Sequence, residues 1–197
     1  MKILLFVDTH DRADVMSNLK SKVKDCDFAV CAGDFTYFGE DIERIMEEIN
    51  DLQIQTYLIH GNHEFPDEVE ALCHVYDNIT FIHNKIVHHK DVLLIGHGGG
   101  GFSPHYPSFE ENMKEFGEKV KKAKKSIFVT HAPPFNTKID EARPGNHVGS
   151  VSYKDFIKKY QPSLCVSGHI HQTAEKTDKE GRTQIINPGW NGYLINL

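Results

Sequence analysis

The sequence has no long apolar run, few cysteines and no repeated or low-complexity segment, and each absence excludes a class of protein. No apolar run approaches the roughly 18–20 residues of a transmembrane helix, so we expect no membrane span. The apolar start of the chain ends at Asp8, too early for a signal peptide, and favours a buried strand. The four cysteines form no C-x-x-C pair, which favours reduced thiols and a cytoplasmic protein over a disulfide-rich secreted one.

The composition is that of an ordinary globular protein with a surplus of histidine. The 197 residues are 39% hydrophobic and 25% charged, and we expect a single domain over 1–197. The 28 acidic and 22 basic residues give a net charge of −6, which disfavours nucleic acid and anionic lipid as partners. The 13 histidines are unusual, and a metal site is one reason for a chain to contain so many. The composition leaves the oligomeric state open.

Hydrophobic patterning predicts a parallel α/β core in the first part of the chain. Three apolar runs closed by polar residues have the pattern of buried strands: Lys2–Val7, Phe28–Cys31 and Ile54–Ile59. A helix is predicted after each strand, from apolar residues at helical spacing or from a proline at the first turn: Asp14–Lys24, Ile42–Ile49 and Pro66–Val75. Alternating strands and helices form parallel sheets with right-handed crossovers.

The second part of the chain is predicted to be less regular. Three short strands with tight connections predict an antiparallel meander: Ile79–Ile82, Lys85–His88 and Val92–Ile95. We expect Phe135–Ser150, which has no clear period, to be a long loop over the site, and Ser152 to cap a helix. The other predicted elements are a helix over Phe109–Val120 and strands over Ser126–Thr130, Leu164–Ser167, Arg182–Ile186 and Tyr193–Asn196.

Side chains that can bind metal ions follow five of the apolar runs. They form five clusters: Asp8 with His10, Asp34, Asn62 with His63, His131, and His169 with His171. Ligands of open α/β sheets bind at the carboxyl edge, where strands end, and residues i and i+2 of an extended segment face the same side. We therefore expect one site assembled from several strand ends.

The donor types and their number predict two metal ions. Carboxylate and imidazole donors without thiolates suit Mn, Fe, Zn, Co or Ni, and they argue against a structural zinc finger. One tetrahedral ion needs about four ligands, so seven donors supply two ions if one carboxylate bridges them: Asp8, His10, Asp34, Asn62, His131, His169 and His171. His63 then remains beside the site as an acid or base, because imidazole is the side chain that moves protons near neutral pH.

Five short motifs resemble, in the same order, the signatures of the calcineurin-like metallophosphoesterase superfamily: Asp8-x-His10, Gly33-Asp34, Gly61-Asn62-His63-Glu64, Thr130-His131-Ala132-Pro133 and Gly168-His169-x-His171. The resemblance extends from the first strand to near the end of the chain. It is closer to the small single-domain phosphodiesterases of prokaryotes than to the larger phosphatases.

This resemblance implies a four-layer α/β/β/α sandwich, in which two facing mixed β-sheets are flanked by helices and the site lies at one edge. It implies one metal ion on Asp8, His10 and His171, a second on Asn62, His131 and His169, Asp34 bridging the two, and His63 as the proton donor to the leaving group. The expected reaction is in-line attack of a metal-bound hydroxide on a small phosphate ester, with nucleotides among the candidates.

Departures from the pattern and competing functions narrow this expectation. The phosphoprotein phosphatases extend the second motif with an Asp and an Arg, which Gly33–Gly39 lacks, so activity on phosphoproteins is disfavoured. A nuclease and a non-catalytic binding scaffold of the same fold are the alternatives. The acidic charge argues against the first, and the intact motifs argue against the second. Glu64 is expected to support the site, whereas His97 and His147 are candidate substrate-binding residues in two loops.

Overall fold

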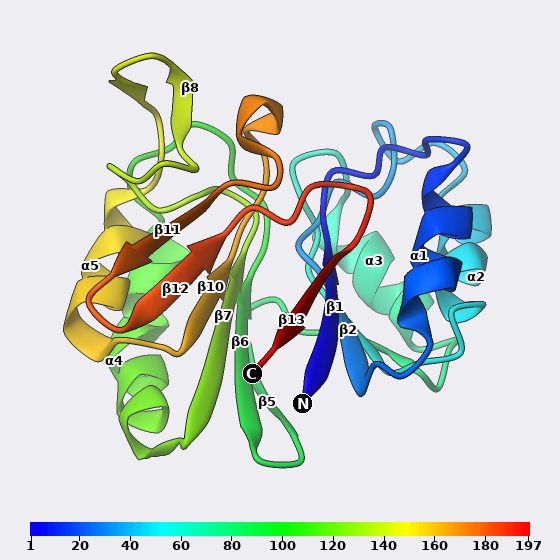
Figure 1. Cartoon of the computed structure of the whole chain (residues 1–197), viewed down its shortest axis with the longest axis horizontal. Coiled ribbons are helices and arrows are strands. Elements are labelled where there is room, and N and C mark those ends of the chain that lie inside the picture. Colours follow the sequence, from blue (N-terminus) through cyan, green and yellow to red (C-terminus); the bar gives the residue numbers. More distant parts are fainter.

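The computed structural model describes residues 1–197 and contains two mixed β-sheets packed face to face (Figure 1). The first sheet has the strand order β13-β1-β2-β3-β4. Strands β1 to β4 are parallel, and β13 is antiparallel to β1. The bounds of its strands are β1 Lys2–Phe6, β2 Phe28–Cys31, β3 Thr56–Leu58, β4 Ile79–Phe81 and β13 Tyr193–Asn196.

The second sheet has the strand order β11-β12-β10-β7-β6-β5. Its central strands β12, β10, β7 and β6 are parallel, and the edge strands β11 and β5 are antiparallel to their neighbours. Its strands are β5 Lys85–His89, β6 Val92–His97, β7 Lys125–Thr130, β10 Leu164–Val166, β11 Thr177–Glu180 and β12 Thr183–Ile186. A separate hairpin is formed by β8 Glu141–Arg143 and β9 Asn146–His147.

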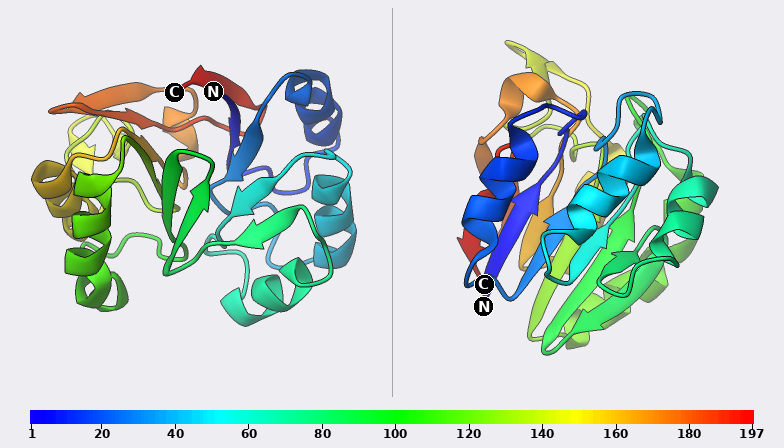
Figure 2. Two further views of the ribbon diagram at one scale, coloured as in Figure 1. Left: turned by 90° about the horizontal axis from the view of Figure 1, so that it is seen from below. Right: turned by 90° about the vertical axis from the view of Figure 1, so that its right-hand side faces the viewer.

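Helices cover the outer faces of both sheets (Figure 2). Three lie on the first sheet: α1 Val15–Val23, α2 Ile42–Asn50 and α3 Pro66–Cys73. Two lie on the second sheet: α4 Pro107–Lys122 and α5 Val151–Tyr160. A short 3₁₀ helix, η1, spans His171–Thr173. The predicted four-layer sandwich is confirmed, and none of these helices has the length and apolarity needed to cross a bilayer.

Three buried clusters fill the spaces between the four layers. The central cluster joins the two sheets and contains residues such as Val30, Ile59 and Val129. The outer clusters join each sheet to its helices. In α2 the apolar stripe lies inward as its spacing predicts, because all four of its apolar residues are buried: Ile42, Ile45, Met46 and Ile49.

The structure corrects three of the local predictions. The antiparallel meander is wrong for its first strand, because β4 pairs in parallel with β3 in the first sheet, and only β5 and β6 form an antiparallel pair. The segment Phe135–Ser150 is not wholly a loop, since it contains the hairpin of β8 and β9. The cap of α5 is Ser150 rather than Ser152, because the Ser150 side chain accepts a hydrogen bond from the backbone N–H of Tyr153.

Candidate metal centre

The eight polar residues expected at the site lie at the carboxyl ends of strands from both sheets. Asp8 and His10 follow β1, Asp34 follows β2, and Asn62 with His63 follows β3, all in the first sheet. His131 follows β7, and His169 with His171 follows β10, both in the second sheet. The strand order places β1 and β2 beside each other, and likewise β7 and β10. The site therefore spans the boundary between the two sheets.

The backbone is strained where it presents several of these side chains. Asp8, His10, Asp34 and His169 have positive φ angles of 54°, 43°, 52° and 68°, in a region that non-glycine residues rarely occupy. Gly61 is required for a different reason, since a Cβ at this position would overlap the backbone and side chain of Asp34. Unfavourable backbone conformations of this kind are common at functional sites, where the surrounding structure holds the side chains in place.

The first group of donors consists of Asp8, His10 and His171. One ligand atom from each lies within 4.8 Å of those from the other two. The Nε2 atoms of His10 and His171 are 3.1 Å apart. The Nδ1 atom of His10 lies 3.0 Å from the carbonyl oxygen of Thr36. Because a carbonyl only accepts hydrogen bonds, Nδ1 of His10 donates, and Nε2 of the neutral ring is left with its lone pair facing the site.

The second group consists of Asp34, His131 and His169, again with ligand atoms within 4.8 Å of one another. The Nε2 atom of His131 lies 3.2 Å from Oδ2 of Asp34 and 3.0 Å from Oδ1 of Asn62. Oδ2 of Asp34 is also 3.8 Å from Nε2 of His10. Asp34 therefore lies between the two groups, as a bridging carboxylate would.

The chemistry of these atoms fits metal ions. His131 Nδ1 donates to the carbonyl oxygen of Ala32 at 2.9 Å, so its Nε2 lone pair points at the oxygens of Asp34 and Asn62 unless the ring is protonated. Nε2 of His169 is buried and has no hydrogen-bond partner. Clustered lone pairs and a buried nitrogen without a partner fit a bound cation. These residues would hold divalent metal, with Asp34 between the two groups.

Without metal, a proton takes the place of a cation within this cluster. Burial acts to lower the pKa of His131, but the charge of Asp34 and its hydrogen bond raise that pKa to about 9. Burial conversely acts to raise the pKa of Asp34, yet His131 holds it well below its ordinary value. Burial raises the pKa of Asp8 to about 7 and lowers that of His169 to about 4. Metal binding therefore competes with protons at this cluster.

His63 lies beside the donors with a hydrogen-bond pattern of its own. The backbone N–H of Phe38 donates to Nδ1 of His63 at 3.1 Å. Because that N–H can only donate, Nδ1 accepts, and Nε2 of the ring carries the proton. This Nε2 lies 3.8 Å from Oδ2 of Asp34. The arrangement suits a proton donor better than a metal ligand, although His63 also lies within 4.8 Å of His10 and Asp34.

Glu64 connects two of the donor loops. Its buried carboxylate accepts hydrogen bonds from the backbone N–H groups of Asp34 at 3.0 Å, Gly61 at 2.8 Å and Thr36 at 2.9 Å, and from the Thr36 hydroxyl at 2.8 Å. Burial, with the charge of Asp34, raises the pKa of Glu64 against the effect of these bonds. Glu64 therefore fixes the loop after β2 to the loop after β3, in the supporting place that the sequence suggests.

The two candidate substrate residues lie outside the donor groups. His97 is buried in the second sheet, and its ring nitrogens contact the Tyr153 hydroxyl at 2.5 Å and the Ser108 hydroxyl at 3.1 Å. This packing closes His97 to a substrate, contrary to expectation. His147 is half-buried in β9, with Nδ1 at 2.6 Å from Oδ1 of buried Asp140. A role for His147 in substrate binding stays a prediction.

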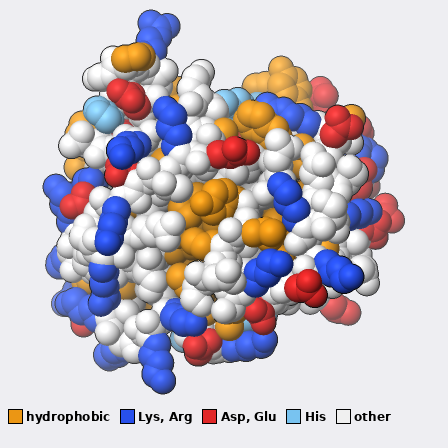
Figure 3. Space-filling model, viewed as in Figure 1, with side chains coloured by type: hydrophobic (Ala, Val, Ile, Leu, Met, Phe, Trp, Pro, Cys, Tyr) orange, Lys and Arg blue, Asp and Glu red, His pale blue; other side chains and the backbone are white.

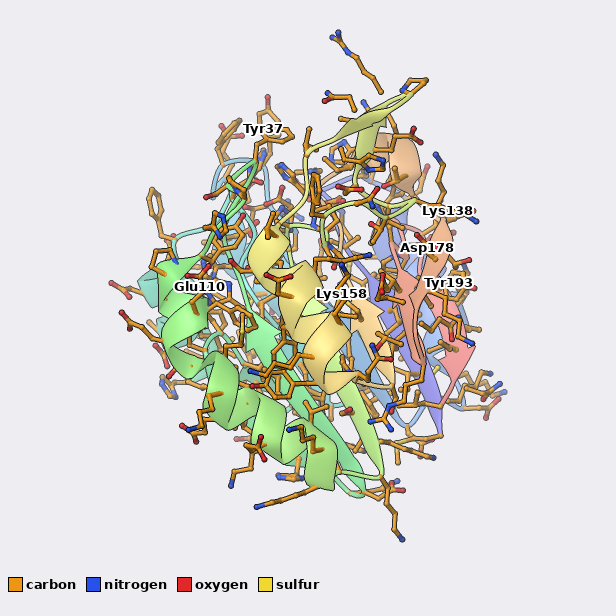
Figure 4. All side chains as sticks on the ribbon, turned by 90° about the vertical axis from the view of Figure 1, so that its left-hand side faces the viewer. Tyr37, Glu110, Lys138, Lys158, Asp178 and Tyr193 are labelled. Carbon is orange, nitrogen blue, oxygen red and sulfur yellow. The ribbon has the colours of Figure 1, made fainter.

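Exposed aromatic side chains flank the donors. Phe38 stacks on His63 with ring centroids 4.1 Å apart, and Phe102 contacts His169 at 4.7 Å. Phe38 is 65% exposed and Phe102 66%. Tyr37, which packs on Phe38, projects at the end of the molecule where the strands end (Figure 4). Sequence reasoning favours a core position over base stacking for Tyr37 and Phe102, because aromatic residues near a core are usually part of it, and the structure exposes both rings instead.

Comparison with known proteins agrees with this geometry. The family model described as calcineurin-like phosphoesterase matches residues 1–173. An uncharacterized protein of Methanocaldococcus jannaschii is 29% identical over 206 residues, covering 99% of this chain and 91% of that protein.

Two solved structures have the same fold at low sequence identity. A protein of Thermus thermophilus superposes with a TM-score of 0.74 at 17% identity, over 96% of this chain and 89% of the other. Phosphopantetheinyl hydrolase from Mycobacterium tuberculosis superposes with a TM-score of 0.64 at 12% identity, over 95% and 88%. The match of the family model over most of the chain, together with the order of its five motifs, shows that the protein belongs to the calcineurin-like phosphoesterase family.

Proposed function

We propose that this protein is a dinuclear-metal phosphodiesterase that hydrolyses small phosphate diesters. The observation that supports this most directly is the pair of donor groups with Asp34 between them, at 3.2 Å from His131 of the second group and 3.8 Å from His10 of the first. Two ions about 3.5–4 Å apart supply Lewis-acid stabilisation and a nucleophile for in-line displacement at phosphorus. Seven donors are available for them: Asp8, His10, Asp34, Asn62, His131, His169 and His171.

His63 is the proposed proton donor to the leaving oxygen. Its protonated Nε2 lies on the side of the ring that faces Asp34, and Phe38 fixes the other nitrogen by a hydrogen bond and the ring plane by stacking. Negative charge develops on the leaving oxygen as the ester bond breaks, and the Nε2–H of His63 is positioned to donate to it. Full proton transfer requires that the ring take up a second proton at Nδ1 in place of the Phe38 hydrogen bond. A histidine that donates to the leaving group without binding metal accounts for the fifth histidine of the site, because only four of the five are proposed metal ligands.

The exposed aromatic rings favour substrates with a planar group. Tyr37, Phe38 and Phe102 present accessible rings beside the donors, and a nucleobase stacks on such rings with about 1–3 kcal/mol per base. A small nucleotide diester is therefore the proposed substrate class. His147, in the hairpin of β8 and β9, is the proposed polar contact to the substrate.

The competing functions have less support. The net charge of −6 disfavours binding to the phosphate backbone of long nucleic acids, for which a nuclease needs a basic surface. On the face drawn in Figure 3, Lys and Arg side chains lie mainly along the left and lower edges, with some Asp and Glu side chains among them. A non-catalytic scaffold has no use for converging donors or an orphaned buried nitrogen on His169.

The proposal is tested by assaying metal-reconstituted protein on bis-p-nitrophenyl phosphate and on p-nitrophenyl phosphate. We expect turnover of the diester to exceed that of the monoester with at least one of Mn, Co, Ni or Zn. The matched measurement is metal content per chain, for which two ions are expected. Protein that contains two ions per chain and hydrolyses neither ester with any of these metals would exclude the proposed activity.

A further inference from the structure

Arg12 is an exposed cation at the edge of the candidate metal centre that has no anionic partner. Its Nη1 donates to the carbonyl oxygen of Asp8 at 2.8 Å. No carboxylate oxygen lies within 4.0 Å of its guanidinium, whereas Arg44 pairs with Asp11, Asp41 and Glu48. An arginine held beside carboxylate donors without pairing with any of them is available for another anion.

The guanidinium of Arg12 is held in place by Trp190. Its central carbon lies 4.1 Å from the centroid of the Trp190 ring, in a cation–π contact. The chain has only one tryptophan, and the loop that supplies it is fixed to the site. Val7 donates its N–H to the carbonyl of Gly189 at 3.1 Å, and the Asn187 amide donates to the carbonyl of Ile170 at 3.2 Å.

The guanidinium of Arg12 lies next to the first donor group. Its Nη1 is 2.8 Å from the carbonyl oxygen of Asp8, and Asp8 is one of the three donors of that group. An anion bound at these donors would therefore lie close to a fixed positive charge.

We propose that Arg12, stacked on Trp190 and anchored to Asp8, binds a non-bridging oxygen of the substrate phosphate. One nitrogen is occupied by the Asp8 carbonyl, and the guanidinium has further N–H groups free to donate. A guanidinium that is already ordered loses little side-chain entropy when it binds a phosphate. Arg12 lies two residues after the first motif, Asp8-x-His10, in the segment that follows β1.

The test measures orthophosphate binding to the metal-loaded protein by calorimetry and by the fluorescence of Trp190. The variants are Arg12→Ala, Arg12→Gln, which retains an amide donor for the Asp8 carbonyl, and Arg12→Lys, which retains the charge without the planar fork. Arg182→Ala removes the same charge far from the site, at the turn between β11 and β12, and serves as the control. Metal content and thermal melting establish that each variant is folded and loaded.

We expect orthophosphate to bind at least about tenfold more weakly to Arg12→Ala and Arg12→Gln, as for loss of one charge-assisted hydrogen bond. Arg12→Lys should fall between these variants and the wild type, and Arg182→Ala should match the wild type. Phosphate should change Trp190 fluorescence only while Arg12 is present. With an ester that the protein hydrolyses, KM of Arg12→Ala should rise by a larger factor than kcat falls.

This inference rests on the proposed function, but its main test does not require turnover. Unchanged phosphate affinity in folded, metal-loaded Arg12→Ala and Arg12→Gln would overturn it, whether or not an ester is hydrolysed. Arg12-dependent phosphate binding without hydrolysis of any ester would refute the proposed activity and support the anion site. An equal loss of affinity in Arg182→Ala would point to the net charge of the protein and would also overturn the inference.

Discussion

Replacing Glu64 by glutamine tests how the donor loops are held together. The glutamine side chain would have the shape of the native one but only one acceptor oxygen. In the native protein, one carboxylate oxygen accepts from the N–H groups of Asp34 and Gly61, and the other accepts from the N–H and the hydroxyl of Thr36. Whichever oxygen becomes an amide nitrogen, it faces at least one backbone N–H that only donates.

The expected loss follows from the number of donors left without acceptors. If the amide faces Thr36, the Thr36 hydroxyl can rotate to accept a hydrogen bond from it, and only the backbone N–H of Thr36 is left without an acceptor. If the amide faces Asp34 and Gly61, two backbone N–H groups are left without an acceptor. Each buried donor without a partner costs about 1–3 kcal/mol. The side chain adopts the orientation that leaves only one N–H without an acceptor, so we expect the free energy of unfolding to fall by about 1–3 kcal/mol. Metal affinity should fall about 10–100-fold, as it does when residues that hydrogen-bond to metal ligands are replaced.

Urea denaturation of the metal-free variant and calorimetric titration with Mn or Zn measure these two effects. Glu115→Gln, at an exposed position of α4, is the control and should change neither value by more than about 0.5 kcal/mol. Native stability and native metal affinity in Glu64→Gln would refute the reasoning, because they would mean that the loops after β2 and β3 keep their positions without this carboxylate.

The remaining predictions concern the donors, the proton donor, the aromatic rings and pH. His63→Ala should lose most turnover and retain both ions. Asp34→Ala should lose turnover and metal together. Metal analysis and the diester assay measure the two effects. Phe102→Ala should raise KM for an aromatic diester about three- to tenfold, from about 1 kcal/mol of lost stacking, and leave KM for an alkyl diester unchanged. In chelator, the melting temperature should fall between about pH 6.5 and pH 9: the pKa of His131 is raised from 6.5 to about 9 in the folded state, so its contribution is complete below 6.5 and lost above 9. Added metal should remove this fall, and a flat profile in chelator would contradict the coupling of His131 to Asp34.

Much of the fold could be predicted because local patterns and tertiary packing agree in the first sheet. The apolar run Phe28–Cys31 is the strand β2 with the same bounds, and the stripe of α2 faces the core. The donors could be located because each follows an apolar run, and parallel strands bring their carboxyl ends together. The two donor groups bring together six of the seven expected donors, and the seventh, Asn62, lies 3.0 Å from His131.

The features of the fold and the site that could not be predicted depend on contacts between residues far apart in the sequence. The meander prediction failed because the short link after β4 crosses from one sheet to the other instead of turning within one. His97 looked accessible in a glycine-rich segment, but β6 extends to include it and its ring packs under Tyr153. The partners of Glu64 and the stacking of Arg12 on Trp190 join segments far apart in the chain, for which no spacing rule exists.

The division of the donors between two sheets has a consequence for the choice of metal. The sheets have separate hydrogen-bond ladders and meet through side chains such as Ile59 and Val129. A small slide of one sheet over the other would move His131 and His169 relative to Asp8 and Asp34 while leaving the spacing within each sheet unchanged. We therefore expect the volume of the hydrophobic interior to influence the size of cation that the donors hold. Substitutions of buried aliphatic residues that touch no ligand should then change the relative affinities for Mn and Zn, which calorimetric titration measures.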